Sequence, residues 1–227
     1  MKKNLWISFV MNVVIAVLVL AATLMGLFDV RFSGTKAISK GADIFKFFTV
    51  QSNILAAFSA IIMAIYEILL LKGKISFVPK WAYLFKLIGT VGVALTMFTV
   101  LFYLAPIMPD GYFSAFYDGN LVMHLLAPLL SILSFVLFEH TDEIRFRETP
   151  LSVLHAFLYG FFYMANAFSH VTNGEIPSEY NWYGFADISV PVTILVSTVM
   201  LSVTFGVGVA LWALNKKIKI NDVADEA

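Results

Sequence analysis

The stretch FFTVQSNILAAFSAIIMAIYEILLL, residues 47–71, determines the fold class of this chain. It is apolar apart from a polar start and one carboxyl, Glu67, and it exceeds the ~20 residues with which an α-helix crosses a bilayer. Membrane-spanning β-strands would be about half as long and would alternate apolar with polar residues. Similar stretches recur along the chain. Together they predict an all-α integral membrane protein, a bundle of six transmembrane helices over about residues 5–28, 47–71, 85–107, 119–138, 151–173 and 188–214.

The composition agrees with a membrane protein. Hydrophobic residues make up 60% of the 227 positions and charged residues only 13%, whereas a soluble domain averages about 25% charged residues. Because the linkers between apolar stretches are short, we expect one six-helix domain over residues 1–227, in the cell membrane. No basic patch interleaved with aromatic residues points to nucleic acid. The chain has no cysteine, which excludes disulfides, thiolate metal sites and cysteine nucleophiles within it.

The distribution of lysine and arginine predicts the orientation of the bundle, since basic residues favour cytoplasmic loops. Most of the 15 basic residues lie at the N-terminus, in the second and fourth loops or in the C-terminal tail, all on one side of the predicted bundle. The opposite side holds only Arg31, Lys36, Lys40 and Lys46. Both termini are therefore expected to be cytoplasmic.

Two predicted helices open with polar residues where apolar ones would be expected. In the second helix, Thr49 and Asn53 are four residues apart and share a face, with Ser52 beside them. In the fourth helix, Asn120 and His124 repeat that spacing. Ionisable residues inside membrane helices are costly and are usually functional or paired, so His124 is the strongest candidate. For the hydroxyl and amide side chains the alternative is structural, because Thr and Ser bond carbonyls of their own helix and Asn bonds across helices.

Several candidate side chains are predicted to share one layer near the outer surface. Two of them stand near the outer ends of the second and fourth helices, one stands near the outer end of the fifth, and one opens the sixth. They are, in that order, Thr49, His124, His170 and Asp187.

Other ionisable residues are expected on the inner side of the bundle. His155, near the start of the fifth helix, falls outside the outer layer. Glu67 precedes Lys72 by five residues and is expected to extend to the cytoplasmic interface. Aromatic side chains in the outer loops are available to roof an acyl-chain pocket: Tyr112, Phe113, Phe116, Tyr117, Tyr180, Trp182 and Tyr183.

The outer layer contains the groups needed for nucleophilic hydrolysis of an ester. A threonine hydroxyl becomes a nucleophile when a nearby base takes its proton, and histidine is the usual base. Asp187 or a neighbouring carbonyl would orient the imidazole, and Asn53, Asn120 or His170 would hold the oxyanion. A Thr–His pair at the outer interface suits an ester whose acyl chains lie in the bilayer.

Three short motifs resemble the androgen-induced protein family, which includes the androgen-dependent TFPI-regulating protein. KFFT (residues 46–49) opens the second helix, and NLVMH (residues 120–124) opens the fourth. The segment from HVTNG (residues 170–174) to YNWYGFAD (residues 180–187) resembles the region between helices five and six of that family. By motif order and helix number the resemblance covers most of the chain, which would be a bacterial-type homologue.

Members of that family are intramembrane threonine hydrolases that cleave fatty acid esters of hydroxy fatty acids. The resemblance implies Thr49 as the nucleophile and His124 as its base, and it assigns no role to His170, Asn173 or Asp187. The chain departs from the animal proteins in three places: TVQSN is more polar after the threonine, YGFAD stands for a Tyr-Pro-Phe-acid run, and GEIPSEYN is an insertion. These departures bear on the substrate more than on the Thr–His pair.

Two other functions stay open from the sequence. His124, His170 and Asp187 are a conceivable ligand set for a zinc ion that activates water, although no HExxH-like spacing supports it. A transporter or a sensor of lipids or small molecules is the second alternative, but such proteins commonly place polar groups near the midplane and carry internal repeats, which we do not find. The favoured prediction is a lipid-ester hydrolase with no metal and no cofactor, whose partners are its ester substrate and the bilayer. The sequence assigns neither the natural ester nor an oligomeric state.

Overall fold

The computed structural model describes residues 2–34, 39–186 and 189–225, which are mostly helical. The described residues form no β-strand beyond an isolated bridge between Thr172 and Glu175. Six helices are long and apolar enough to cross a membrane: Lys3–Leu27, Phe48–Leu71, Lys80–Ile107, Gly119–Leu137, Phe146–Ser169 and Val190–Ile218. The predicted all-α class with six spanning helices is confirmed, and the chain is a multi-pass membrane protein.

Three of the spans are single continuous α-helices. They are α1 (Lys2–Leu27), α2 (Phe48–Leu71) and α7 (Val190–Asp225). A 3-10 helix, Gly41–Lys46, leads into α2. Its last residue is followed by Phe47, whose extended backbone turns the chain into the first turn of α2. The entry to α2 is therefore a sharp, ordered corner immediately before Thr49.

The other three spans change helix type along their length. The third span consists of α3 (Lys80–Thr99), a π-helical turn (Val100–Leu104) and a 3-10 turn (Ala105–Ile107). The fourth consists of α4 (Gly119–Leu121), a π-helical turn (Val122–Leu126) and α5 (Ala127–Leu137). The fifth consists of a 3-10 helix (Phe146–Val153) and α6 (Leu154–Ser169). The third span thus begins at Lys80 rather than near residue 85, and the fifth begins at Phe146 and ends at Ser169. Pro106 and Pro128 follow the two π-helical turns, and each lacks the N–H that would continue an α-helical ladder.

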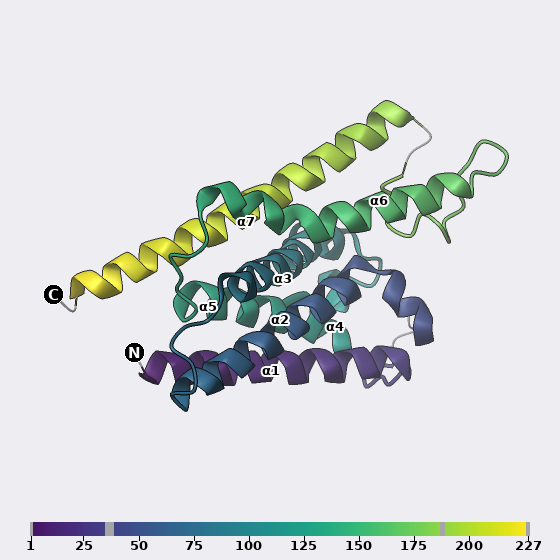
Figure 1. Cartoon of the computed structure of the whole chain (residues 1–227). Coiled ribbons are helices and arrows are strands. Elements are labelled where there is room, and N and C mark those ends of the chain that lie inside the picture. The colour runs from purple at the N-terminus through teal and green to yellow at the C-terminus, as the bar shows by residue number, and fades with distance from the viewer. Residues whose placement is uncertain (1, 35–38, 187–188, 226–227) are drawn as a thin grey trace.

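The α3 helix occupies the centre of the bundle. In Figure 1, α1, α2 and α5 lie on one side of α3, while α6 and α7 form a layer on the other side. The buried share of the span that contains α3 is 61%, against 17% for the spans that contain α6 and α7. The α6–α7 layer is thus in contact with the rest of the protein over a limited face, which leaves room for a cavity between that layer and α3.

Small residues allow α2 and α3 to cross closely. A Cβ atom added at Gly89 would lie 2.9 Å from the Ser59 hydroxyl and 3.0 Å from the Ala56 Cα atom. A Cβ atom at Gly92 would lie 3.2 Å from the Ser52 Cβ atom. Close backbone approach at glycine is a common way to pack membrane helices, because lipid supplies no hydrophobic force between them. This crossing holds the polar face of α2 against α3.

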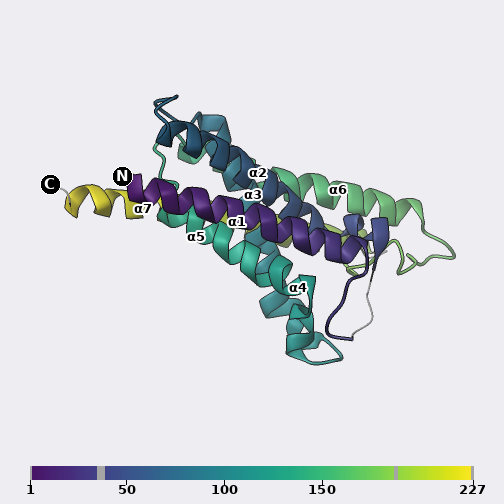
Figure 2. The ribbon, with the colours of Figure 1, turned by 90° about the horizontal axis from the view of Figure 1, so that it is seen from below.

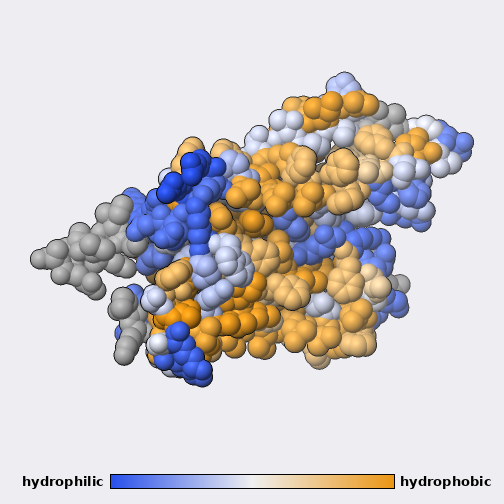
Figure 3. Space-filling model, in the orientation of Figure 1, coloured by the Kyte–Doolittle hydropathy of each residue, from blue (hydrophilic) through white to orange (hydrophobic). Residues whose placement is uncertain are grey.

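The two ends of the chain lie at the same end of the bundle (Figures 1 and 2). The loops that follow α1, the third span and α6 therefore meet at the opposite end. Figure 3 shows hydrophobic side chains over the middle of the bundle, with hydrophilic ones gathered toward its ends. This pattern is the one expected of a bundle embedded in a bilayer.

Candidate active site

Two cavities meet at Thr49. A cavity of about 340 Å³, here called the polar cavity, is lined at the loop end by residues that include Arg31, Asp118, Asn120 and His124. A second cavity of about 410 Å³, here called the apolar cavity, lies between α3, α6 and α7, and its surface is mostly apolar although several Thr and Ser residues line it. The residues that line both are Thr49, Val100, Leu104 and Tyr183. The hydroxyl that the sequence singled out thus stands at the junction of a polar and an apolar space.

Thr49 is held in the first turn of α2. The first N–H groups of a helix have no partner within the helix, and here the Phe48 N–H donates to the Tyr183 hydroxyl at 2.9 Å. The Tyr183 oxygen also interacts with the backbone and the hydroxyl of Thr49. Burial raises the pKa of Tyr183 to about 12, although hydrogen bonds from Phe48 and Thr49 partly offset the effect. Tyr183 is therefore a neutral phenol at ordinary pH and acts next to Thr49 as a hydrogen-bonding group rather than as a base.

Asn53 links the nucleophile candidate to the base candidate. Its side-chain amide nitrogen donates to the Thr49 carbonyl at 2.8 Å and to the Met123 carbonyl at 3.0 Å. Met123 directly precedes His124, so one fully buried amide joins the start of α2 to the π-helical turn Val122–Leu126. Asn53 is thus a positioning residue rather than a ligand of the oxyanion, because its donor nitrogen is already engaged.

Ser52 has a structural role. Its hydroxyl lies 3.1 Å from the Thr49 carbonyl and 3.0 Å from the Thr96 hydroxyl of α3, and its side chain is completely buried. This is the carbonyl-bonding and helix-packing role that small hydroxyl side chains often have in membrane helices. Ser52 lines neither cavity.

His124 is oriented by a backbone carbonyl. Its Nδ1 atom lies 2.6 Å from the Ala115 carbonyl oxygen. A carbonyl oxygen only accepts hydrogen bonds, so the proton of the neutral imidazole resides on Nδ1 and Nε2 is left as the acceptor. No hydrogen bond joins Thr49 to His124 among the described residues, but both side chains line the polar cavity. The imidazole is therefore in the tautomer that a general base requires.

Asn120 also lines the polar cavity, together with His124. Its backbone N–H donates to the Tyr117 carbonyl at 3.1 Å, so the start of the fourth span is tied to the preceding loop. Its side-chain amide is a candidate donor to a bound oxyanion.

His170 is not part of this site. Its ring stacks on Tyr180 with 3.7 Å between ring centroids, its Nδ1 atom lies 2.8 Å from the Asn166 carbonyl, and it lines neither cavity. Asp187 lies outside the described residues. Within the part of the chain that the structure describes, no group of three His, Cys, Asp or Glu side chains is arranged to hold a metal ion. His170 thus lies outside the cavity wall that holds His124, and residues 2–34, 39–186 and 189–225 contain no assembled zinc site.

The expected positions of two inner residues are wrong. Glu67 does not extend to the interface: it is 2% exposed and bonds to Asn12 inside the bundle. His155 does not lie apart from the outer layer either, because its ring stacks on Phe48 with 4.9 Å between centroids. The 3-10 helix Phe146–Val153 rises further per residue than an α-helix, which carries His155 toward the level of Thr49.

Part of the expected aromatic roof is present. Tyr183 lines both cavities, and Trp182 and Tyr117 line the polar cavity. The other four aromatic residues expected in the roof, Tyr112, Phe113, Phe116 and Tyr180, line neither cavity. The apolar cavity lies between α3, α6 and α7, with Tyr183 in its wall.

Sequence reasoning missed Arg31 and Asp118, which lie in the wall of the polar cavity. Arg31 pairs with Asp29 at 3.0 Å. The Asp118 carboxylate accepts hydrogen bonds from the N–H groups of Phe32 and Ser33 at 2.8 and 3.0 Å. The Ser33 hydroxyl and these backbone donors lower the pKa of Asp118. The available signal for Asp118 was a charged residue immediately before an apolar helix. Its partners, Phe32 and Ser33, come from another loop, so no local sequence pattern reveals them.

Comparison of the chain with protein families, with curated proteins and with solved structures found no match.

Proposed function

We propose that this chain is an intramembrane ester hydrolase that cleaves lipid esters, such as fatty acid esters of hydroxy fatty acids, with Thr49 as nucleophile and His124 as general base. The observation that carries the proposal is the position of Thr49, at the junction of the polar and apolar cavities with His124 in the same wall. The resemblance of three motifs to the androgen-induced protein family supports the same pair. The bundle is proposed to lie in the cell membrane with both termini cytoplasmic, so that the cavities face the outer leaflet.

The chemistry follows from the placement of these groups. An acyl chain in the apolar cavity brings its ester carbonyl to the junction, where the Thr49 oxygen attacks the carbonyl carbon while His124 Nε2 takes the hydroxyl proton. The tetrahedral oxyanion collapses, the alcohol leaves with the proton from His124, and an acyl–Thr49 ester forms. Water then attacks that ester with His124 as base, which releases the fatty acid and restores the threonine hydroxyl.

Two neutral groups would assist this reaction. Tyr183 lies at the junction and Asn120 lies in the wall of the polar cavity, and the Tyr183 phenol and the Asn120 amide would stabilise the oxyanion as hydrogen-bond donors. The N-terminus of α2 adds a partial positive charge at the same place, through the aligned peptide dipoles of the helix. Asn53 would fix the position of Thr49 relative to the turn that carries His124, because its amide bonds a carbonyl in each of them.

The test is hydrolysis of a panel of lipid esters by the purified protein. We expect Thr49→Ala and His124→Ala each to lower kcat at least ~10²-fold, the usual scale for loss of a general base or nucleophile. A hydroxyl-directed fluorophosphonate should label Thr49 covalently, and less so in His124→Ala.

Matched controls are available on the same chain. Thr198 lies on the exposed face of α7 and His170 lines neither cavity, so Thr198→Ala and His170→Ala should retain activity. Turnover that survives in both Thr49→Ala and His124→Ala would refute the pair. Activity that disappears on metal chelation would favour a zinc mechanism instead.

A second candidate function is the binding of an intact lipid, for transport or sensing. It rests on the apolar cavity itself, which is lined from α3, α6 and α7 by residues such as Leu95, Met164 and Met200. A lipid-binding protein would retain an ester substrate unchanged, and its affinity would not depend on His124. Mass spectrometry of lipid recovered after incubation distinguishes the two, because only the hydrolase returns the free acid and alcohol.

A further inference from the structure

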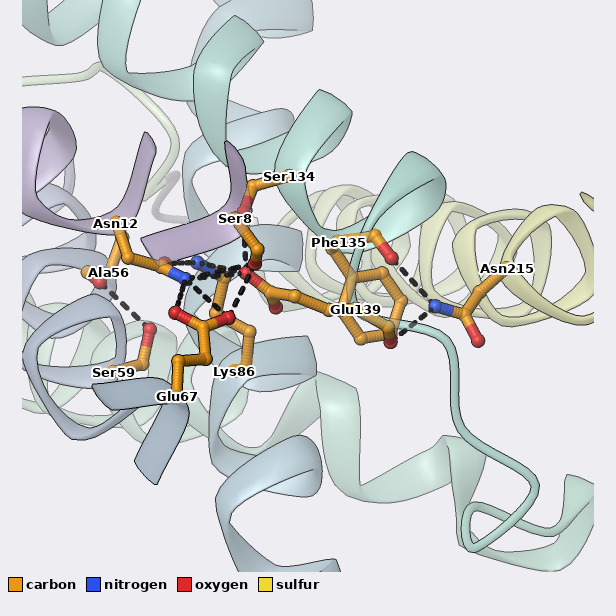
Figure 4. Close-up of polar contacts among 10 residues, drawn as sticks. All are labelled: Ser8, Asn12, Ala56, Ser59, Glu67, Lys86, Ser134, Phe135, Glu139 and Asn215. Atoms are coloured by element: carbon orange, nitrogen blue, oxygen red, sulfur yellow. Dashed lines mark hydrogen bonds and ion pairs between the residues drawn. The ribbon is translucent and has the colours of Figure 1, made fainter. Parts of the chain in front are cut away.

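A network of buried polar side chains joins four spans (Figure 4). It lies toward the end of the bundle that holds the termini, since Ser8 and Asn12 are in the first half of α1 and Glu67 is near the end of α2. Its members, here called the inner network, are Ser8 and Asn12 of α1, Glu67 of α2, Lys86 of α3, Ser134 of α5 and Glu139. None of them is more than 3% exposed. None lines the polar or the apolar cavity, so the network belongs to neither part of the proposed active site.

One ammonium group stands beside one of the two carboxylates. The Lys86 Nζ atom lies 3.1 Å from Glu139 Oε1, and Lys86 and Glu139 side chains are 1% and 0% exposed. Lys86 also donates to the Asn12 side-chain oxygen. Glu139 Oε1 accepts further hydrogen bonds from Asn12 at 2.9 Å and from Ser134. Lys86 and Glu139 thus form a fully buried ion pair with shared neutral partners.

Glu67 has no such counter-ion among its hydrogen-bond partners. Its carboxyl oxygens contact the Asn12 amide nitrogen at 3.3 and 3.2 Å, and the Ser8 hydroxyl. Both partners are neutral. The serine hydroxyl is also able to accept a hydrogen bond, so it suits a carboxylic acid as well as a carboxylate.

The charge count of the inner network is therefore unbalanced. Two carboxylates and one ammonium leave one negative charge that the network itself does not neutralise. A buried unpaired charge costs several kcal/mol or more, and such a group usually binds a proton instead. Glu139 Oε2 reinforces the imbalance, because it is buried and has no hydrogen-bond partner among the described residues. The network thus contains one unused hydrogen-bond acceptor, Glu139 Oε2, and has one positive charge fewer than it has negative charges.

We propose that the inner network is a proton-binding site that holds one proton at neutral pH, carried by Glu67 as a neutral carboxylic acid while Glu139 stays ionised beside Lys86. Binding adds the proton to a carboxylate oxygen of Glu67, and the new O–H donates to the Ser8 oxygen. The Asn12 amide donates to the other Glu67 oxygen. The site is then electrically neutral and each of its charged groups has a charged partner.

A proton fits this site better than a metal cation. The Lys86 ammonium already occupies the position between Asn12 and Glu139 where a cation would bind, and a second cation would be repelled by it. The described residues contain no metal-ligating group of three acidic or imidazole side chains. A proton needs no coordination shell and fits between two atoms already in contact.

Few other ionisable groups face the network. On α3, Tyr83 lies within electrostatic reach of both Glu67 and Glu139, and Glu143 acts on Tyr83 from the loop after α5. A phenol is ordinarily neutral at pH 7, so Tyr83 does not change the charge count. His140 directly follows Glu139, and its Nδ1 atom lies 3.3 Å from the Asn215 backbone carbonyl. From α7, the Asn215 side chain bonds the backbone carbonyl of Glu139 at 2.9 Å and brings no charge.

The test counts protonated carboxyls by infrared spectroscopy of the purified protein at neutral pH. A protonated carboxyl has a C=O stretching band that moves to lower frequency in D₂O. If the inner network is electrically neutral, the number of protonated carboxyls in it equals its number of carboxyl groups minus its number of ammonium groups. The wild type should show one such band, Glu67→Gln and Glu139→Gln none, and Lys86→Met about twice the wild-type area.

A double variant and two controls check that the number of protonated carboxyls does not depend on the side effects of one substitution. Combining Glu67→Gln with Lys86→Met should restore one band, since one carboxyl and no ammonium remain. Glu179→Gln removes an exposed carboxyl of an outer loop and should leave the band unchanged. Thr49→Ala should leave it unchanged as well, so the outcome is separate from that of the hydrolase test.

Two results would overturn the proposal. Absence of a deuterium-sensitive carboxyl band in the wild type would mean that both carboxylates are ionised. A wild-type band that persists unchanged in Glu67→Gln and in Glu139→Gln would place the proton elsewhere in the protein. The first result needs only the wild type and the second only the two Glu-to-Gln variants, so both stand even if Lys86→Met does not fold.

Discussion

At the residue scale, the polar start of α2 divides into three roles. Thr49 points to the junction of two cavities, Asn53 ties that turn to the turn of His124, and Ser52 packs α2 against α3. The i,i+4 spacing of Thr49 and Asn53 correctly placed them on one face. It did not show that the amide of Asn53 would be engaged by two carbonyls, because one of those carbonyls comes from another span.

We expect Asn53→Ala to loosen the link between Thr49 and His124. The substitution removes the two hydrogen bonds that the Asn53 amide donates to the Thr49 and Met123 carbonyls, and the loss of such a bond costs roughly 0.5–1.5 kcal/mol. Thermal unfolding should shift down, and phosphonate labelling of Thr49 should slow even in the fraction that remains folded. Asn166→Ala, on α6 and outside both cavity walls, is the matched control. Equal labelling rates in Asn53→Ala and wild type would show that Asn53 does not position the nucleophile.

At the element scale, the positions of the site residues depend on the π-helical and 3-10 segments within the spans, and not only on the number of spans. The π-helical turns at Val100–Leu104 and Val122–Leu126 supply Val100 and Leu104 to both cavities and His124 to the polar cavity. The 3-10 helix Phe146–Val153 brings His155 against Phe48. Apolar length predicts that a segment spans the membrane, but it carries no information about such local changes in rise, which is why the depth of His155 was predicted wrongly.

The crossing of α2 and α3 depends on Gly89. A Cβ atom there would meet the Ala56 backbone, which cannot move aside as a side chain can, so Gly89→Ala should destabilise the protein by roughly 1–3 kcal/mol through overpacking. Gly206→Ala on α7 is the matched control, because nothing lies within 4 Å of its added Cβ and alanine favours a helix. Thermal unfolding of both variants measures the difference; a Gly89→Ala protein as stable as Gly206→Ala would contradict the close crossing.

At the scale of the whole molecule, the six spans separate two polar centres. The proposed active site lies where the loops after α1, the third span and α6 meet, and the inner network lies toward the termini. The apolar cavity lies between α3 and the α6–α7 layer, and no residue of the inner network lines it. In the proposed hydrolase, an acyl chain in the apolar cavity would therefore not contact the charged network.

The proposed hydrolase predicts that the apolar cavity sets acyl-chain length. Gly160 lines this cavity, and nothing lies within 4 Å of a Cβ atom added there, so Gly160→Phe should fill the space without a clash. We expect kcat/KM to fall about tenfold or more for long-chain esters and to change little for short-chain esters, since each excluded methylene forfeits ~0.8 kcal/mol of burial. Gly206→Phe, outside the cavity wall, is the control. An equal loss for all chain lengths would place the acyl chain elsewhere.

The sequence by itself determined the class of the molecule: six apolar spans, no cysteine chemistry, and two spans that open with hydroxyl, amide and imidazole groups. These are local properties of length and composition. Only the tertiary structure decided which polar groups share a space: Thr49 with His124, His170 apart from both, and Glu67 turned inward to Asn12 and Ser8. The physical reason is that lipid and protein interior are both apolar, so hydrophobic periodicity does not mark the inward face of a membrane helix. The rotation and depth of each helix follow instead from packing, such as the Gly89 crossing, and from hydrogen bonds between spans.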